Sequence, residues 1–303
     1  MFELLLLGKK VGNNGQIYTG PSLCIFAGGA NSGTTTTFKI TDKYFLKDDT
    51  VSSGTMLIVE RRETSGAGNL SEGFVFGGAS SVTTIASTER YVYSTDVVSA
   101  STNMLYGLWG TAATGNADMA IITGGYNTSA SQKFVYSTKT MLATTNLDSA
   151  VYRHCASSNV ETGFFFKTGS SRASIRRYNY SSATITSGVE LSLAGEGPAA
   201  AGTTNYAVIS SAYNATNWTG TEKYNYGANT KATGTKLNTG RIYLCAAGDK
   251  QKSIFGLGQS KAGSIVNLTE GYYFSNDSVA PGTSLSVARY GAASLSAPPG
   301  WVV

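Results

Sequence analysis

The sequence is poor in charge, histidine and cysteine. Charged residues make up 14% of the 303 residues, against about 25% in typical soluble domains. The single histidine is His154, and the three cysteines, Cys24, Cys155 and Cys245, are far apart. This set provides neither a tetrahedral zinc site nor a disulfide framework, so we expect no metal or other cofactor. The cysteines are expected to lie buried in strands as small apolar side chains.

Long apolar runs are also missing. The run Leu4–Leu7 is short, and an acidic residue precedes it where a secretory signal peptide has bases. No stretch of the chain approaches the about 18 consecutive apolar residues that a membrane-spanning helix needs. The sequence therefore predicts neither a signal peptide nor membrane insertion, and it indicates synthesis in a reducing compartment.

The net charge of +5 is spread thinly along the chain. Its longest basic clusters are the pairs Arg61-Arg62 and Arg176-Arg177. A nucleic-acid-binding surface shows a much denser patch of lysine and arginine. We therefore expect no nucleic-acid partner.

Glycine, tyrosine, serine and threonine are abundant instead. The chain has 36 glycines, 18 tyrosines and 12 phenylalanines, and 41% of its residues are hydrophobic. That apolar content excludes a disordered chain. Gly, Ser and Thr interrupt every window long enough for a helix, and apolar residues alternate or form short runs, which is typical of strands joined by tight turns. The composition therefore predicts an all-β fold.

Four sequence elements recur six times between residues 23 and 294. They are an apolar run that closes on small residues (Phe74–Gly78), a charged pair followed by alternating aromatics (Glu89–Tyr93), a Gly-Thr or Thr-Asn step before a leucine (Gly54–Leu57), and an arginine followed by small residues (Arg289–Ala293). The leading aromatics are Tyr44, Tyr91, Phe134, Tyr178, Tyr224 and Tyr272, so successive copies are 47, 43, 44, 46 and 48 residues apart. Four strands in each unit of this length predict the blades of a β-propeller.

The two ends of the repeat array predict how the propeller closes. The repeats open on an apolar run (Cys24–Gly29) and end on an arginine-led element (Arg289–Ser294), so the copies are out of phase by one strand. We therefore predict six blades of four strands each, with the first blade closed by the C-terminal strand. The Gly and Ala residues of the apolar runs are expected nearest the crowded axis. The tyrosines are expected further out, packed between blades.

The order of these elements resembles the kelch family of propellers over residues 23–294. The tryptophan that follows the tyrosine strand in kelch repeats is absent, and a step such as Gly54–Leu57 stands in its place; the fourth and fifth copies also lack the Gly-Gly pair. The Ser-, Thr- and Gly-rich composition is similar to that of kelch-like propellers in bacteriophage tails, fibres and baseplates. The resemblance implies a structural or receptor-binding part of a virion, and it identifies no binding residue.

The acidic residues indicate no catalytic group. Acids at matching repeat positions are expected to stabilise the blades by pairing with the Lys or Arg beside them. These acids are Asp42, Glu89, Glu222 and Glu270. The sequence lacks both the grouped carboxylates of glycosidases and the Ser-x-Asp-x-Gly-x-Thr-Trp box of sialidases, so we expect no enzyme. The alternative of a catalytic acid in a loop leaves Asp118, Glu161 and Glu196.

The histidine and the repeated arginines have structural explanations. His154 and Cys155 are neighbours in a predicted strand, so their side chains point to opposite faces and do not form a nucleophilic pair. Arg153, Arg241 and Arg289 recur in the arginine-led element. We expect them to cap carbonyls at strand ends or to pair with an acid of a neighbouring blade. The alternative is a ring of arginines that lines the axis.

Candidate recognition residues lie where the repeat pattern is interrupted. Exposed aromatic rings with amides nearby are typical of carbohydrate sites. The candidates are Trp109, Tyr213, Asn214, Asn217 and Trp218. The alternative is that each tryptophan packs onto its own blade. The unrepeated ends supply candidate docking residues, which are Phe2, Leu4, Leu6, Pro298, Pro299 and Trp301.

The sequence thus divides into an N-terminal docking arm or extra strand (1–22), the propeller (23–294) and a C-terminal tail (295–303). The leading hypothesis is a non-enzymatic structural component of a phage virion, synthesised in the host cytoplasm. It would attach to other virion proteins or to copies of itself in a symmetric assembly. The alternative is a propeller on the virion or on a cell surface that binds a receptor or a host surface glycan.

Overall fold

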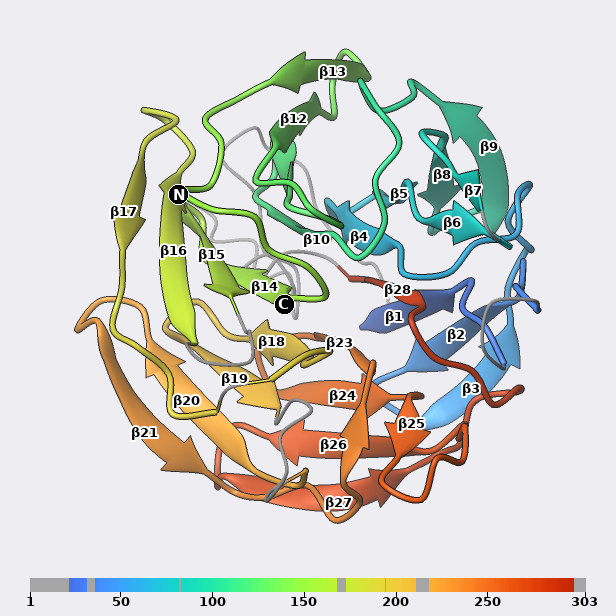
Figure 1. Ribbon diagram of the computed structural model, residues 1–303. Helices are drawn as coiled ribbons and strands as arrows, with labels where there is room; N and C mark the ends of the chain where they lie inside the picture. Colours follow the sequence, from blue (N-terminus) through green and yellow to red (C-terminus); the bar gives the residue numbers. More distant parts are fainter. Residues whose placement is uncertain are drawn as a thin grey trace, which may run out of the picture.

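The computed structural model describes residues 22–31, 36–81, 83–167, 173–193, 195–210 and 218–296. They form six four-stranded antiparallel sheets, arranged around a central axis like the blades of a propeller (Figure 1). No helix occurs in these ranges. The predicted all-β propeller with six four-stranded blades is confirmed.

Each blade runs from an innermost strand at the axis to an outermost strand at the rim (Figure 1). The innermost strands are β28 (Ala293–Leu295), β4 (Ser65–Gly68), β10 (Ala112–Gly115), β14 (Cys155–Ser158), β18 (Ala200–Gly202) and β23 (Cys245–Gly248). The second strands are β1 (Leu23–Ala27), β5 (Glu72–Phe76), β11 (Met119–Thr123), β15 (Thr162–Lys167), β19 (Tyr206–Ser210) and β24 (Lys252–Gly256). The third strands are β2 (Thr41–Phe45), β8 (Thr88–Val92), β12 (Ser131–Val135), β16 (Ser174–Asn179), β20 (Thr221–Asn225) and β26 (Thr269–Tyr273). The outermost strands are β3 (Thr50–Ser53), β9 (Val97–Ser101), β13 (Thr140–Ala143), β17 (Ile185–Ser187), β21 (Thr230–Gly234) and β27 (Ser278–Gly282).

Two short sheets lie on the connections between these strands. They pair β6 (Ala79–Ser80) with β7 (Thr83–Thr84), and β22 (Arg241–Ile242) with β25 (Gln259–Ser260). We number the blades along the chain, so that blade 1 contains β1 to β3 and blade 6 contains β23, β24, β26 and β27.

The C-terminal strand closes the ring, as predicted. β28 pairs antiparallel with β1, with Ile25 opposite Leu295 and Ala27 opposite Ala293, and it forms the innermost strand of blade 1. Arg289, just before β28, donates from Nε to Gly28 O at 2.8 Å. The first and last strands of the propeller are therefore joined in one sheet.

The strand nearest the axis is the small-residue strand, and the prediction that placed the apolar run there is wrong. The innermost strands of neighbouring blades contact one another around the axis. A Cβ on Gly66 of β4 would lie 2.4 Å from Leu295 Cδ2, so this position has no room for a side chain. The bulky side chains of Phe74 and Phe76 lie one strand further out, where the blades diverge.

Aromatic side chains of the second and third strands fill the space between blades. Phe74 of blade 2 lies 4.7 Å from the ring of Phe134 in blade 3. Phe164 of blade 4 stacks on Tyr226 of blade 5 with ring centroids 4.1 Å apart. All four side chains are buried. The prediction that tyrosines pack between blades is confirmed, and this burial holds neighbouring blades together.

Buried arginine–carboxylate pairs fix the start of the innermost strand in three blades. In blade 6, Glu270 accepts hydrogen bonds from the backbone N–H groups of Asn238 at 2.6 Å and Thr239 at 3.2 Å. The same carboxylate forms a 2.6 Å ion pair with Arg241. The equivalent pairs are Arg61–Glu89 in blade 2 and Arg289–Asp42 in blade 1. Burial lowers the pKa of Arg241, and the charge of Glu270 opposes that shift.

These pairs correct the expected partner of the repeated acids. Asp42, Glu89 and Glu270 pair with the arginine that precedes their own blade's innermost strand. Glu222 has no such arginine; it accepts the backbone N–H groups of Ser192 and Leu193 and lies 3.8 Å from Lys231. The adjacent base Arg90 pairs with Glu72 instead of Glu89. Arg241 also caps strand carbonyls, as predicted, with Nη1 at 2.9 Å from Leu257 O.

Arg153 does not belong to this set, which corrects the alignment made from sequence. Counted back from the innermost strand, Val151 occupies in blade 4 the position of Arg241 and Arg289. Arg153 lies two residues further on, where its backbone N–H bonds to Gly110 O of blade 3. Its side chain therefore has a different environment from the capping arginines.

The Gly-Thr-x-Leu step joins neighbouring blades at the rim. Thr55 of blade 1 donates its backbone N–H to Asp96 Oδ1 of blade 2 at 3.0 Å, and Tyr91 Oη donates to the same oxygen. A Cβ on Gly54 would lie 2.9 Å from Tyr91 Oη, so glycine leaves room for the tyrosine of the next blade. The equivalent threonines Thr235 and Thr283 bond to blade 6 and blade 1.

Candidate functional site

Six residues, one from each blade, form a closed ring of backbone hydrogen bonds around the axis. Each lies just before an innermost strand and donates its N–H to the carbonyl of the equivalent residue in the preceding blade. The bonds are Glu63 to Gly291 (2.6 Å), Gly110 to Glu63 (2.8 Å), Arg153 to Gly110 (2.8 Å), Gly197 to Arg153 (3.0 Å), Tyr243 to Gly197 (2.8 Å) and Gly291 to Tyr243 (3.1 Å). We call these six residues the axial ring.

All six residues of the axial ring have a left-handed backbone, and glycine alternates with larger residues. The glycines are Gly110 (φ 68°), Gly197 (φ 69°) and Gly291 (φ 62°), and the others are Glu63 (φ 49°), Arg153 (φ 52°) and Tyr243 (φ 55°). A Cβ on Gly197 would lie 2.3 Å from Tyr243 Cδ1, so a large residue requires glycine beside it. A non-glycine residue in this conformation costs about 1 to 2 kcal/mol. Strain that persists with large polar side chains indicates a functional position.

The three large residues of the axial ring meet over the axis. Arg153 donates from Nε to Glu63 Oε2 at 3.0 Å, from Nη2 to Glu63 Oε1 at 2.6 Å and from Nη1 to Tyr243 Oη at 2.9 Å. Its guanidinium carbon lies 4.5 Å from the ring centre of Tyr152 and 4.5 Å from that of Tyr243. Burial acts to lower the pKa of Arg153, but the hydrogen bonds and charge of Glu63 raise it above its usual value. Arg153 is thus a fixed cation.

Three aromatic side chains stack beside this arginine. Trp109 and Tyr126 lie 5.2 Å apart at an interplanar angle of 23°, and Tyr152 meets Trp109 edge-on at 5.2 Å. Arg62 lies over the Trp109 ring at 5.6 Å. Tyr126 is 55% exposed, whereas Trp109 and Tyr152 are partly buried, so Tyr126 is the most exposed ring of this group.

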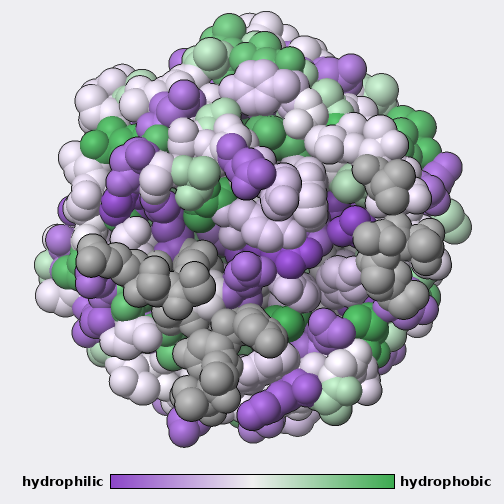
Figure 2. Space-filling model, in the orientation of Figure 1, coloured by the Kyte–Doolittle hydropathy of each residue, from purple (hydrophilic) through white to green (hydrophobic). Residues whose placement is uncertain are grey.

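We call Glu63, Trp109, Tyr126, Tyr152, Arg153 and Tyr243 the axial cluster. They come from blades 2, 3, 4 and 6 and lie on or beside the connections that enter the innermost strands. Figure 2 shows the molecule from the side seen in Figure 1, and hydrophilic and near-neutral residues gather at the centre of this face.

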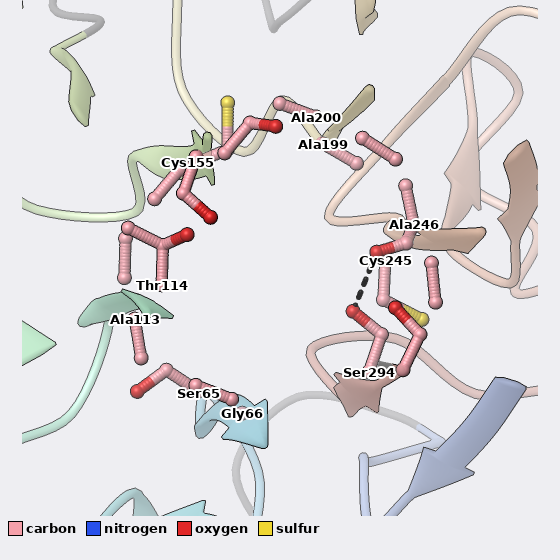
Figure 3. A pocket seen from close by; sticks show the side chains of 18 of the residues that line it. Ser65, Gly66, Ala113, Thr114, Cys155, Ala199, Ala200, Cys245, Ala246 and Ser294 are labelled. Atoms are coloured by element: carbon pink, nitrogen blue, oxygen red, sulfur yellow. Dashed lines mark hydrogen bonds between the residues drawn. The ribbon is translucent and has the colours of Figure 1, made fainter. Parts of the chain in front are cut away.

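Small side chains line a cavity of about 160 Å³ along the axis (Figure 3). Its lining includes Gly66, Ala113, Ala200, Ala246 and Ser294, and Ser294 Oγ donates to Ala246 O at 2.7 Å. Among the described residues that line it, none carries a charged side chain at neutral pH. The expected alternative of a ring of arginines along the axis is therefore not what the described residues form.

His154 and Cys155 also line this cavity, and both have structural environments. His154 Nε2 lies 2.8 Å from Thr123 Oγ1. Burial, with a smaller contribution from Lys167, lowers the pKa of His154 to about 3, so the ring is neutral at neutral pH. Burial also raises the pKa of Cys155. A neutral imidazole beside a protonated thiol does not supply a nucleophile. Cys24 and Cys245 are likewise buried, as expected.

The structure separates the candidates identified from sequence. Trp109 belongs to the axial cluster, whereas Trp218 lies on blade 5, partly buried beside Gly240. Of the loop acids, Glu196 lies at the cluster, while Asp118 and Glu161 lie in turns that lead from an innermost strand to the second strand. The other recognition candidates, Tyr213, Asn214 and Asn217, lie outside the described residues, as do the docking candidates Phe2, Leu4, Leu6, Pro298, Pro299 and Trp301.

Sequence reasoning missed Glu63, Tyr126, Tyr152 and Tyr243. One signal could have found Glu63 and Tyr243. The residue that lies two positions before the innermost strand, or three positions before it in blade 5, alternates between glycine and a larger residue around the ring. Tyr126 follows Gly124-Gly125, where an aromatic residue interrupts the small residues of the turn.

The chain matches no protein-family model and no curated protein sequence at a significant level. No three His, Cys, Asp or Glu side chains of the described residues come together in a way that could hold a metal ion. Within the same residues, no helix is long and apolar enough to cross a membrane.

Proposed function

We propose that the protein is a non-enzymatic recognition propeller and that its axial cluster binds a carbohydrate. The exposed, stacked ring of Tyr126 carries the proposal. An aromatic face that is open on one side and supported on the other suits the apolar face of a sugar. The guanidinium group of Arg153 lies nearby to bind hydroxyls.

The exposed ring of Tyr126 is the platform on which a sugar would stack, and Trp109 supports that ring from behind. Tyr126 covers one part of the Trp109 ring system, Tyr152 meets its edge, and the Arg62 guanidinium lies over it. Tyr126 keeps 55% of its surface exposed. Asn127, beside it, is exposed in a left-handed turn (φ 57°) and offers an amide to the same ligand.

The electrostatics of the cluster support binding over catalysis. Glu63 accepts hydrogen bonds from both Arg62 and Arg153 and is buried. Both of its carboxylate oxygens already accept hydrogen bonds from guanidinium groups, so neither is open to a reacting group. Side chains that are already rigid and hydrogen-bonded to one another are suited to recognition, because they lose little conformational freedom when a ligand binds.

Replacing Tyr126 with alanine is expected to lower affinity for the ligand by about tenfold or more, as truncation of a central aromatic residue does in other interfaces. A glycan array of bacterial surface polysaccharides, followed by titration of the bound polysaccharides, measures this loss. Tyr106→Ala is the matched control, because Tyr106 is also exposed and shares a connection with Trp109 but is not part of the stack of Trp109, Tyr126 and Tyr152. Equal losses in both variants, or no polysaccharide bound by the unchanged protein, would contradict the proposal.

The second candidate is a structural component of a phage tail, fibre or baseplate that attaches to other virion proteins. An asymmetric group of exposed apolar residues on the connections after blades 1 and 2 favours it. Met56, Ile58 and Leu105 are each at least 50% exposed. The positions equivalent to Ile58 and Leu105 in the other blades are Asp148, Ser192, Asn238 and Ser286. Because the other blades carry polar residues at these positions, we take the exposed apolar residues as the candidate attachment surface.

The double substitution Ile58→Ser and Leu105→Ser is expected to reduce incorporation into particles to about a tenth or less, since each side chain loses its apolar burial in the contact. Quantitative mass spectrometry of purified particles measures the amount incorporated. Val97→Ser is the control, because Val97 is similarly exposed but lies on the outermost strand β9. Normal incorporation of a correctly folded double variant would argue against this attachment surface.

A further inference from the structure

Arg153 holds two acidic side chains very differently. Glu63 accepts two hydrogen bonds from it, at 2.6 and 3.0 Å, and the Glu63 side chain is 4% exposed. Glu196 lies 3.4 Å from Nη1, and its side chain is 45% exposed. A long, exposed contact of this kind contributes little stability, because water competes for both charges. Glu196 is therefore the partner that a ligand can replace.

The guanidinium is held in place without Glu196. The rings of Tyr152 and Tyr243 lie on it at 4.5 Å each. Glu63 fixes its Nε and Nη2 groups, and Tyr243 Oη accepts from Nη1 at 2.9 Å. The edge that carries Nη1 keeps its position when Glu196 leaves. A planar guanidinium fixed in this way is pre-organised for a carboxylate.

The side chain of Tyr152 lies between the exposed ring of Tyr126 and the guanidinium group of Arg153. Tyr152 lies 5.6 Å from Tyr126, ring centre to ring centre, and 4.5 Å from the guanidinium carbon of Arg153. A sugar on Tyr126 therefore has Arg153 within reach of a substituent on its ring. When Glu196 leaves, Glu63 is the one acid still paired with Arg62 and Arg153, so these three side chains together carry a net positive charge.

We infer that the axial cluster binds an acidic sugar, whose carboxylate takes the place of Glu196 on the Nη1 edge of Arg153. This inference rests on the proposed recognition of a carbohydrate, and it specifies the chemical class. A neutral sugar gains only hydrogen bonds at this edge. A carboxylate gains charge-assisted bonds to a cation that is already oriented, and these are about twice as strong.

The test uses bacterial polysaccharides that contain uronic or other carboxylated sugars, each paired with its carboxyl-reduced form. The acidic member of each bound pair is expected to bind about tenfold tighter or more, the value of one charge-assisted hydrogen bond. Raising the salt concentration should narrow the difference. Glu196→Gln is expected to strengthen binding of the acidic member about two- to fivefold, since an exposed ion pair is lost, and to leave the neutral member unchanged.

Two variants keep the test interpretable. Arg153→Gly is compatible with the left-handed backbone at this position, matches the glycines at the alternate positions of the axial ring and leaves Glu63 paired with Arg62. This variant should abolish the preference for the acidic member. Glu190→Gln changes an exposed acid on the connection after blade 4 and should change nothing. Equal affinity for both members, or no effect of Glu196→Gln, would overturn the inference while carbohydrate recognition stands. Failure to bind either member of any pair would overturn both.

Discussion

A chain that ends at residue 291 is expected not to form a stable propeller. It lacks β28, the innermost strand of blade 1, and thereby loses the pairing of Ala293, Ser294 and Leu295 with β1. It also uncovers Ile25 and Phe26, which are fully buried. Since burying one large apolar side chain contributes about 1.5 to 3 kcal/mol, the summed loss should exceed about 5 kcal/mol, which is the whole stability of many domains.

The truncation is checked by near-ultraviolet circular dichroism, size-exclusion chromatography and thermal unfolding. The matched control is a chain that ends at residue 296, which keeps β28 and should unfold cooperatively near the temperature of the unchanged protein. β28 also touches both neighbouring blades, through β4 and β23, so its loss opens the ring at two contacts. A cooperative transition within a few degrees for the chain ending at residue 291 would show that blade 1 does not need this strand.

Replacing Arg241 with leucine is expected to lower the free energy of unfolding by about 3 to 5 kcal/mol, the usual result of removing one partner of a buried ion pair. Glu270 would lose its ion-pair partner at a site where it is 3% exposed. Its remaining donors would be the backbone N–H groups of Asn238 and Thr239. The carbonyls of Leu257 and Leu268, which accept from Arg241 Nη1, would also lose their donor. Urea denaturation measures the change.

Blade 3 supplies a second variant that sharpens this prediction. There, Leu108 stands in the position of Arg241, and Gln132 stands in the position of Glu270. Gln132 Oε1 accepts the backbone N–H of Leu105 at 2.7 Å, so the connection is fixed without a charge. The double variant Arg241→Leu with Glu270→Gln copies this arrangement and should regain most of the lost stability.

An exposed ion pair provides the control for both variants. Lys223 lies 3.3 Å from Asp277, and both side chains are partly exposed. Lys223→Met is expected to change the free energy of unfolding by less than about 1 kcal/mol. If Arg241→Leu has an effect as small as this, the buried pair is not what fixes the start of the innermost strand.

The number of blades and the closure of the ring followed from the sequence because each blade repeats the same environment. The leading aromatics, from Tyr44 to Tyr272, recur at intervals that match one four-stranded blade, and a buried tyrosine between blades requires the same residue each time. The repeats begin with an apolar run and end with the arginine-led element Arg289–Ser294, so the first blade lacks the strand that the C-terminal end supplies. Six equal four-stranded blades can form only if this last strand completes blade 1.

The order of strands within a blade was not predictable in the same way. Both the apolar run of Phe74–Gly78 and the small-residue strand Ser65–Gly68 contain glycine beside apolar residues. Only the curvature of the closed ring shows which of them lacks room for side chains. The space at the axis depends on the number of blades and on their tilt, and neither property is local in sequence.

The sequence singled out Trp109 of the candidate site, and tertiary structure decided the rest. Glu63 and Arg153 are 90 residues apart, and so are Arg153 and Tyr243, yet all three side chains meet over the axis. From sequence, Arg153 was grouped with Arg241 and Arg289 because each precedes a stretch of small residues, and a shift of two positions leaves that pattern unchanged. The repeated residues allow the scaffold to be predicted from the sequence. Residues that differ between blades come together only when the ring closes, because their contact depends on the arrangement of all six blades.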